Sequence, residues 1–132
     1  MASETPIPTG REFEILEILW ARREATVREV YETMREQAPI VQNTIQAFLR
    51  TMTEKGLVDY RKEGRSFVYR PLVQQTRTKN QLLKNMLERV FDGSLEGLVA
   101  SALQLKKPRK AELQELRRLL EGMEAGKRGK RS

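Results

Sequence analysis

The sequence predicts a mainly α-helical protein that carries one small β-hairpin. Over most of the 132-residue chain, apolar residues recur three or four positions apart, which is helical spacing. Between residues 57 and 69 they instead alternate with polar residues, which is the pattern of strands. Thr, Gly and Pro residues stand where these segments would begin and end. These three observations give the fold class, and the elements follow in order.

The first two predicted helices both open with a capping box. Thr9 is followed three positions later by Glu12, and Thr26 by Glu29. In each pair the Thr hydroxyl can accept a hydrogen bond from the backbone amide of the Glu, while the Glu side chain reaches back toward the Thr. The first helix should end near Arg22. Its inward stripe is predicted to hold Phe13, Leu16 and Trp20, with Ile15 and Leu19 beside it. The second is expected to stop at 38–39, because a residue before proline is pushed out of the helical region.

A third helix is expected over residues 41–55, followed by the hairpin. Gly56 stands where a helix can end on a left-handed residue. Strands are predicted at 57–61 and 66–69, joined by a turn in which Gly64 is free to adopt a positive φ. Three short helices followed by a hairpin is the order of a winged helix-turn-helix domain. The buried stripe of the third helix is predicted to be Ile45, Phe48, Leu49 and Met52.

The rest of the chain reads as further short helices. They are expected over 78–90, 95–103 and 113–123, separated by Gly93 and Pro108. We therefore expect a winged-helix DNA-binding domain at 9–74, a helical dimerisation domain at 75–124 and a basic disordered tail at 125–132.

Composition narrows the function classes. The chain has no Cys and no His, which excludes thiol chemistry, the usual zinc sites and the commonest general base. We expect that the protein binds no cofactor and no metal and that it is not an enzyme. The sequence shows no signal peptide or apolar span, so a cytoplasmic protein is expected.

The positive charge is concentrated in the middle of the chain. Residues 40–80 hold 8 Lys and Arg against 3 Asp and Glu, a net charge of +5 out of +7 for the whole chain. A localised basic block is typical of a surface that binds a polyanion. Ordinary surface basicity that keeps the protein soluble is the alternative.

The solvent face of the third helix suits a DNA major groove. Asn43, Gln46, Ala47 and Arg50 lie opposite the apolar stripe, and amides and arginine are the side chains that pair with base edges. The hairpin turn beside it is basic, as a wing that grips the backbone would be. The residues predicted to contact DNA are Gln42, Asn43, Thr44, Gln46, Ala47, Arg50, Arg61, Lys62 and Arg65. Two alternatives exist. The polar residues of the third helix could serve only to begin the helix and to contact solvent, and the Arg and Lys residues of the hairpin could serve only to prevent its edge strands from pairing with other chains. Phe67 is expected to pack in the sheet.

The C-terminal helices carry more apolar surface than a thin helical hairpin can cover. A second copy of the same helices is the simplest partner, because twofold symmetry is the commonest arrangement. The residues predicted at this dimer interface are Leu82, Leu83, Met86, Leu98, Val99, Leu103, Leu116 and Leu120. A monomer in which these helices fold back on the winged domain is the alternative.

Several runs of the sequence resemble the penicillinase repressor family, which includes BlaI, MecI and the copper-responsive CopY repressors. They are EILEILW at 14–20, IQAFLRTMTEKGLV at 45–58, EGRSFVYRP at 63–71, VFDGSLEGLV at 90–99 and ELQEL at 112–116. The resemblance covers about residues 9–122. It implies a homodimer that binds a palindromic operator in double-stranded DNA and blocks transcription.

The resemblance also implies a further partner, a membrane-bound sensor protease. In several members this sensor triggers cleavage at an Asn-Phe bond in the C-terminal helices. The corresponding pair here is Ser101-Ala102, which departs from that pattern. The copper-responsive relatives carry a C-terminal cysteine cluster, and this chain has none. The sequence therefore predicts a sequence-specific repressor, with a nonspecific nucleic-acid-binding protein as the alternative.

Overall fold

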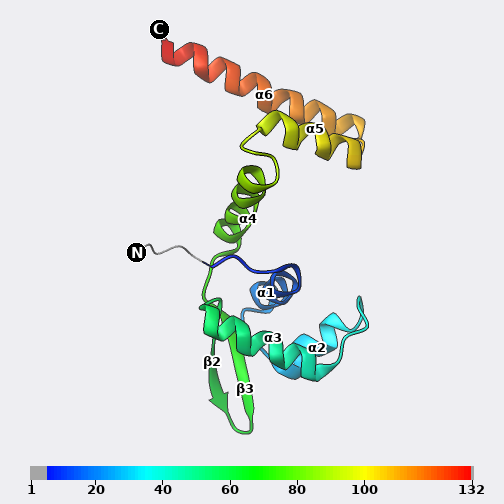
Figure 1. Ribbon diagram of the computed structural model, residues 1–132, viewed down its shortest axis with the longest axis vertical. Coiled ribbons are helices and arrows are strands. Elements are labelled where there is room, and N and C mark those ends of the chain that lie inside the picture. The colour runs from blue at the N-terminus through cyan, green and yellow to red at the C-terminus, as the bar shows by residue number, and fades with distance from the viewer. Residues whose placement is uncertain (1–5, 132) are drawn as a thin grey trace. The chain divides into compact units, whose positions relative to one another are not determined.

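The computed structural model describes residues 6–131, with side chains through residue 126 (Figure 1). The chain divides into two compact units between Met86 and Leu87, and each is described by itself. The elements, in chain order, are α1 (Gly10–Arg22), β1 (Ala25–Thr26), α2 (Val27–Met34), α3 (Gln42–Lys55), β2 (Val58–Glu63), β3 (Ser66–Pro71), α4 (Gln75–Arg89), α5 (Leu95–Leu105) and α6 (Lys110–Arg131). The fold is mainly helical with one small antiparallel sheet, as predicted.

The sheet has three strands rather than two. Its order is β1-β3-β2, and β1 pairs Ala25 with Tyr69 and Thr26 with Val68. The sequence analysis missed β1 because two residues are too few to show an alternating pattern. In the hairpin, Tyr60 lies opposite Tyr69 and Lys62 opposite Phe67. Gly64 in the turn has a φ of 63°, the left-handed conformation that the sequence predicted.

Both predicted capping boxes are present. Thr9 Oγ1 accepts from the Glu12 amide at 3.3 Å while the Thr9 amide donates to Glu12 Oε1 at 2.9 Å. The matching distances for Thr26 and Glu29 are 3.1 and 2.8 Å. α2 ends at Met34, earlier than the proline suggested, because the amides of Gln37 and Ala38 turn back to the Met34 carbonyl at 3.0 and 3.1 Å.

One apolar core joins the three helices to the sheet. Phe13, Trp20 and Phe48, which the helical stripes predicted to face inward, are only half-buried. Of these, Trp20 and Phe48 pack against the edge of this core. Trp20 packs edge to face on Phe13 with ring centroids 5.6 Å apart, and its indole N–H donates to the Val73 carbonyl at 2.9 Å. The largest fully buried side chains are those of Ile15, Leu16, Leu19, Val30, Ile45, Leu49, Met52, Leu57, Val58 and Thr78.

An ion pair between an exposed lysine and a buried carboxylate joins α3 to α1. The Lys55 ammonium, in the last turn of α3, donates to both carboxylate oxygens of Glu12 at 2.8 and 3.0 Å. Glu12 is only 2% exposed, and it also caps its own helix through Thr9. The Glu12 carboxylate therefore caps the N-terminus of α1 and also binds α3. The candidate site is built on α3.

The C-terminal helices are longer than the sequence predicted. α4 begins at Gln75 rather than 78. α6 continues to Arg131, so the backbone over 125–131 is helical where a disordered tail was predicted; Ser132 lies outside the described residues. No proline interrupts this segment, and its Lys and Arg residues favour a helix C-terminus. Within residues 6–131, no helix is both long and apolar enough to span a bilayer.

Candidate nucleic-acid interface

The polar face of α3 is open to solvent. Asn43, Gln46 and Arg50 are all exposed, whereas Ile45, Leu49 and Met52 on the opposite side of the helix are completely buried. The side chains predicted to meet base edges therefore lie on the free face, and Ala47 between them leaves the backbone accessible.

The N-terminus of α3 differs from those of α1 and α2. Its N-cap residue is Val41, which makes no side-chain cap hydrogen bond, and the first turn contains no acidic residue. The positive end of the helix dipole is therefore offset neither by a capping side chain at Val41 nor by a carboxylate in the first turn. Gln42 and Thr44, both exposed, flank this end, where a backbone phosphate would be stabilised.

The inner face of the hairpin is turned toward α3. A hollow of about 340 Å³ lies between the two, lined by Gln46, Arg50, Thr53 and Glu54 of α3 and by Tyr60, Phe67 and Tyr69 of the strands. Phe67 is 42% exposed and packs edge to face on Tyr60, with ring centroids 5.3 Å apart. Phe67 thus packs within the sheet as expected, at its solvent edge.

The basic residues of the hairpin fall on different faces. Strand side chains alternate, so Lys62, opposite Phe67, lies on the inner face with Tyr60, and Arg61 lies on the outer face. Figure 1 shows the hairpin projecting beyond α3, with the turn that contains Arg65 at its tip. Lys62 and Arg65 are exposed and form no ion pair with any side chain that the structure describes.

Arg61, which the sequence predicted to contact DNA, is bound to acidic residues in this structure. Its guanidinium donates to Glu24 at 2.7 and 2.9 Å and to Glu63 at 2.9 and 3.2 Å. The hydrogen bond from Arg61 lowers the pKa of Glu24, and the same contact raises the pKa of Arg61, so both groups are charged at neutral pH. The structure therefore does not bring Arg61 together with the α3 face. The sequence already held a signal for this: neighbouring residues of a strand point to opposite faces, so Arg61 and Lys62 could not both face α3.

Two inner-face residues were missed by the sequence analysis. Glu54 and Tyr60 line the hollow beside Arg50, yet neither was predicted as a site residue. Burial raises the pKa of the neighbouring Tyr69, while the positive charge of Arg50 acts in the opposite direction. Glu54 follows Arg50 by four positions, so both fall on the same face of a helix, and this spacing was the signal available in the sequence.

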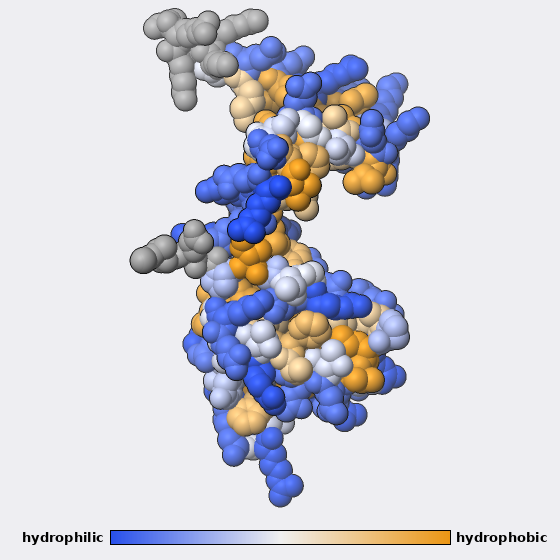
Figure 2. Space-filling view, viewed as in Figure 1, coloured by the Kyte–Doolittle hydropathy of each residue, from blue (hydrophilic) through white to orange (hydrophobic). Residues whose placement is uncertain are grey.

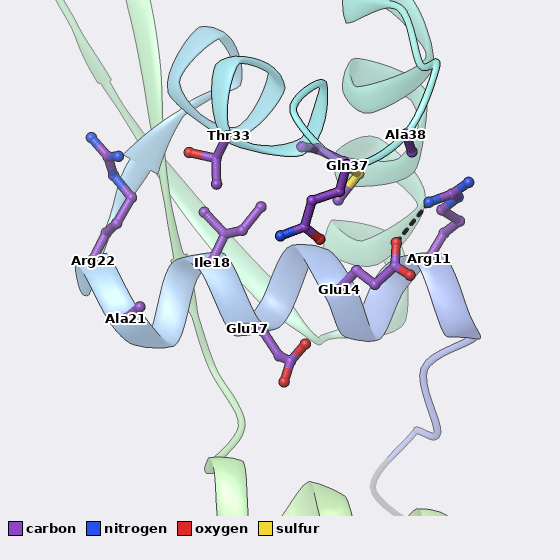
Figure 3. A pocket seen from close by; sticks show the side chains of 10 residues that line it. Arg11, Glu14, Glu17, Ile18, Ala21, Arg22, Thr33, Gln37 and Ala38 are labelled. Atoms are coloured by element: carbon purple, nitrogen blue, oxygen red, sulfur yellow. Dashed lines mark hydrogen bonds and ion pairs between the residues drawn. The ribbon is translucent and has the colours of Figure 1, made fainter.

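A second hollow, of about 370 Å³, lies between α1 and α2 (Figure 3). Ile18 forms part of its wall, and Gln37 points into it from the end of α2. At its rim Arg11 pairs with Glu14 at 2.8 Å, both exposed. Thr33 also lines this hollow, and its hydroxyl donates to the Glu29 carbonyl at 3.1 Å rather than to Glu14 or Glu17.

The three-stranded sheet, the buried side of α3 and its free polar side define a winged helix-turn-helix protein. The sequence pattern of the penicillinase repressor family matches residues 8–122, and the chain belongs to this family. Proteins of this family are transcriptional regulators, and the chain is not an enzyme.

Named relatives match over most of their own length. The methicillin resistance regulatory protein MecI of Staphylococcus aureus strain N315 is 26% identical over 120 residues, which cover 91% of this chain and 98% of that protein. The penicillinase repressor of Bacillus licheniformis is 27% identical over 116 residues, covering 88% and 91%.

Solved structures agree on the fold. The DNA-binding domain of the repressor BlaI is 27% identical, with a TM-score of 0.51 over 57% of this chain and 92% of that domain. A MarR variant from E. coli, solved with operator DNA, is 14% identical with a TM-score of 0.52 over 88% and 75%. At that identity the likeness to MarR concerns the fold alone.

Proposed function

We propose that this chain is a homodimeric transcriptional repressor that binds a palindromic operator through α3. The observation that carries the proposal is the free face of α3, where amides and one arginine stand beside the inner face of a basic hairpin. The relatives named as repressors, matched over nearly their whole length, support the same conclusion.

The proposed contacts divide into two kinds. Asn43, Gln46, Ala47 and Arg50 meet base edges in the major groove, where amides suit adenine and arginine suits guanine. A second group binds the phosphate backbone and sets the register of the protein on DNA. It consists of Gln42 and Thr44 at the start of α3 and of Lys62 and Arg65 in the hairpin.

A second copy of the chain is the proposed partner of the C-terminal helices. No residue from Leu87 to Gly126 is buried, and Figure 2 shows apolar surface on this part of the chain. Leu82 and Leu98 are half-buried. The other proposed interface residues are exposed: Leu83, Met86, Val99, Leu103, Leu116 and Leu120. Burial of such side chains stabilises by about 1.5–3 kcal/mol each, which a twofold dimer would supply.

The test compares two arginines at different places in the proposed interface. Arg50→Ala should weaken binding to the operator and relax base preference, because it removes a base contact. Arg65→Ala should weaken binding to all DNA about equally and reduce the salt dependence, because it removes a phosphate contact. Anisotropy titrations with operator and random duplexes measure both, and Arg28→Ala, exposed on α2, is the matched control. Equal loss of preference in the two variants would contradict the assigned roles.

Nonspecific nucleic-acid binding is the second candidate, and the basic middle of the chain favours it. Competition between operator and bulk DNA across a salt series separates the two functions. Loss of all preference at moderate salt would support the nonspecific protein.

A membrane-bound sensor protease is the remaining partner in the proposal. The bond that corresponds to the cleavage site of several family members, Ser101-Ala102, lies inside α5, so this helix must unwind locally before a protease can cut it. Mass spectrometry of the protein from induced cells would detect the cut or an intact chain.

A further inference from the structure

The outer face of the hairpin carries two separate groups of ion pairs. Arg61 on β2 lies opposite Val68 on β3, which in turn lies opposite Thr26 on β1. The Arg61 side chain therefore crosses the central strand to reach Glu24, just before β1. On the same face Arg70 pairs with Asp59 at 3.3 Å.

The contact between Arg61 and Glu24 is bidentate. Nη1 donates to Oε1 at 2.7 Å and Nη2 to Oε2 at 2.9 Å. Arginine binds a phosphate group through the same parallel pair of N–H donors. The Glu24 carboxylate thus occupies the position around Arg61 that a DNA phosphate would otherwise take, and Glu63 holds the Nε side of the guanidinium.

The backbone before Glu24 is unusual. Arg23 ends α1 with a φ of 77° and a ψ of −38°, a backbone conformation that non-glycine residues rarely adopt. This turn directs the chain from α1 into β1 and places Glu24 at the edge of the sheet. Strained residues persist where the surrounding structure fixes them, often next to functional groups.

We propose that Glu24 is a specificity-determining residue that holds Arg61 as an internal partner and thereby weakens binding of the wing to nonspecific DNA. This inference rests on the proposed function. Sequence-independent affinity grows with each cation that neutralises a phosphate, whereas base reading by α3 does not involve Arg61. Removing one such cation from the wing raises the ratio of operator affinity to nonspecific affinity.

The test uses Glu24→Gln in the full chain, with a labelled random-sequence duplex titrated at several KCl concentrations. Release of Arg61 should add one phosphate contact and steepen the slope of log K against log salt by about 0.9. Between about 50 and about 200 mM salt this adds about a 3.5-fold loss of affinity, starting from tighter binding at low salt. The preference for operator over random DNA should fall.

Three controls isolate the effect of Glu24. Glu17→Gln, at an exposed position on α1, changes the net charge equally and should leave the slope nearly unchanged. Arg61→Gln alone should not alter the slope either, and the double variant Glu24→Gln/Arg61→Gln should return to the slope of the unmutated protein. Thermal unfolding by circular dichroism verifies that each variant is folded.

Two results would overturn the proposal. One is a slope reduced by about 0.9 in Arg61→Gln, which would mean that Arg61 already binds phosphate in the unmutated protein. The other is an equal response to Glu24→Gln and Glu17→Gln. Absence of any operator preference in the unmutated protein would instead refute the proposed function, and the random-DNA slopes would still decide the role of Glu24.

Discussion

The two compact units use their apolar residues in opposite ways. Before residue 79, helices and sheet enclose a core in which side chains such as Leu16, Ile45 and Leu49 have no exposed surface. From Leu87 to Gly126 no side chain is buried, and Val90, Leu105 and Leu120 are largely exposed. The first unit completes its core from its own chain, whereas the second presents apolar surface that only another molecule or segment can cover.

Truncation of a leucine should be costly in the first unit and cheap in the second. Leu49→Ala should lower the free energy of unfolding by about 2–5 kcal/mol, because it removes buried methyl groups and leaves a cavity. Leu105→Ala, where the side chain is 89% exposed, should change it by about 0.5 kcal/mol or less. Urea unfolding at one fixed protein concentration measures both, and similar losses in the two variants would remove the distinction.

Charge on the apolar face of α6 should separate the proposed dimer and leave the first unit folded. Leu116→Glu combined with Leu120→Glu places carboxylates at the seam, where their desolvation opposes association. Sedimentation velocity should show a monomer, and near-ultraviolet circular dichroism should retain the signal of Trp20. Arg117→Glu on the same helix is the control and should remain dimeric. A monomeric unmutated chain would contradict the proposed assembly.

Loss of the ion pair between α1 and α3 should destabilise the first unit moderately. Lys55→Ala leaves the Glu12 carboxylate buried, with the Thr9 amide as its remaining hydrogen-bond donor among the described residues. The expected cost is about 1–3 kcal/mol in urea unfolding, the penalty for an unsatisfied buried polar group. Lys62→Ala removes an exposed lysine instead and should leave stability unchanged. An equal effect of the two substitutions would show that α3 is held by apolar packing alone.

The smallest expected effect is the pH dependence of the pair between Glu24 and Arg61. The folded chain lowers the pKa of Glu24 from 4.5, so the pair contributes fully above that value and is lost as the pH falls through the lowered pKa. The positive charge of Arg70 acts in the same direction. Arg61→Gln should therefore melt slightly below the unmutated protein at pH 7 and together with it in acid. A constant difference in Tm across this range would argue against the pair.

The sequence predicted those features that depend on neighbours along the chain. Capping boxes at Thr9 and Thr26, the left-handed Gly56 and the free face of α3 are all set by residues a few positions apart, and the structure confirms them. Contacts across the fold could not be predicted in this way. The pairing of Lys55 with Glu12 spans 43 residues and that of Arg61 with Glu24 spans 37, and neither leaves a local pattern.

Contacts between distant segments also account for the corrections. β1 exists because β3 offers it a partner, and a two-residue segment has no periodicity of its own. Arg61 was predicted to contact DNA from its charge and its place beside the hairpin turn, and that prediction stays untested. Of its two acidic partners, Glu24 lies in a segment that the sequence did not connect with the hairpin. The DNA-contact and dimer residues remain predictions that the experiments above can decide.

The hydrogen bond of Trp20 gives this protein a built-in optical probe. The chain has a single tryptophan, and its indole N–H donates to the Val73 carbonyl where the chain leads from β3 into α4. Tryptophan fluorescence therefore comes from one known place, without any label. A red shift of this emission would report that α1 has come away from the segment leading into α4.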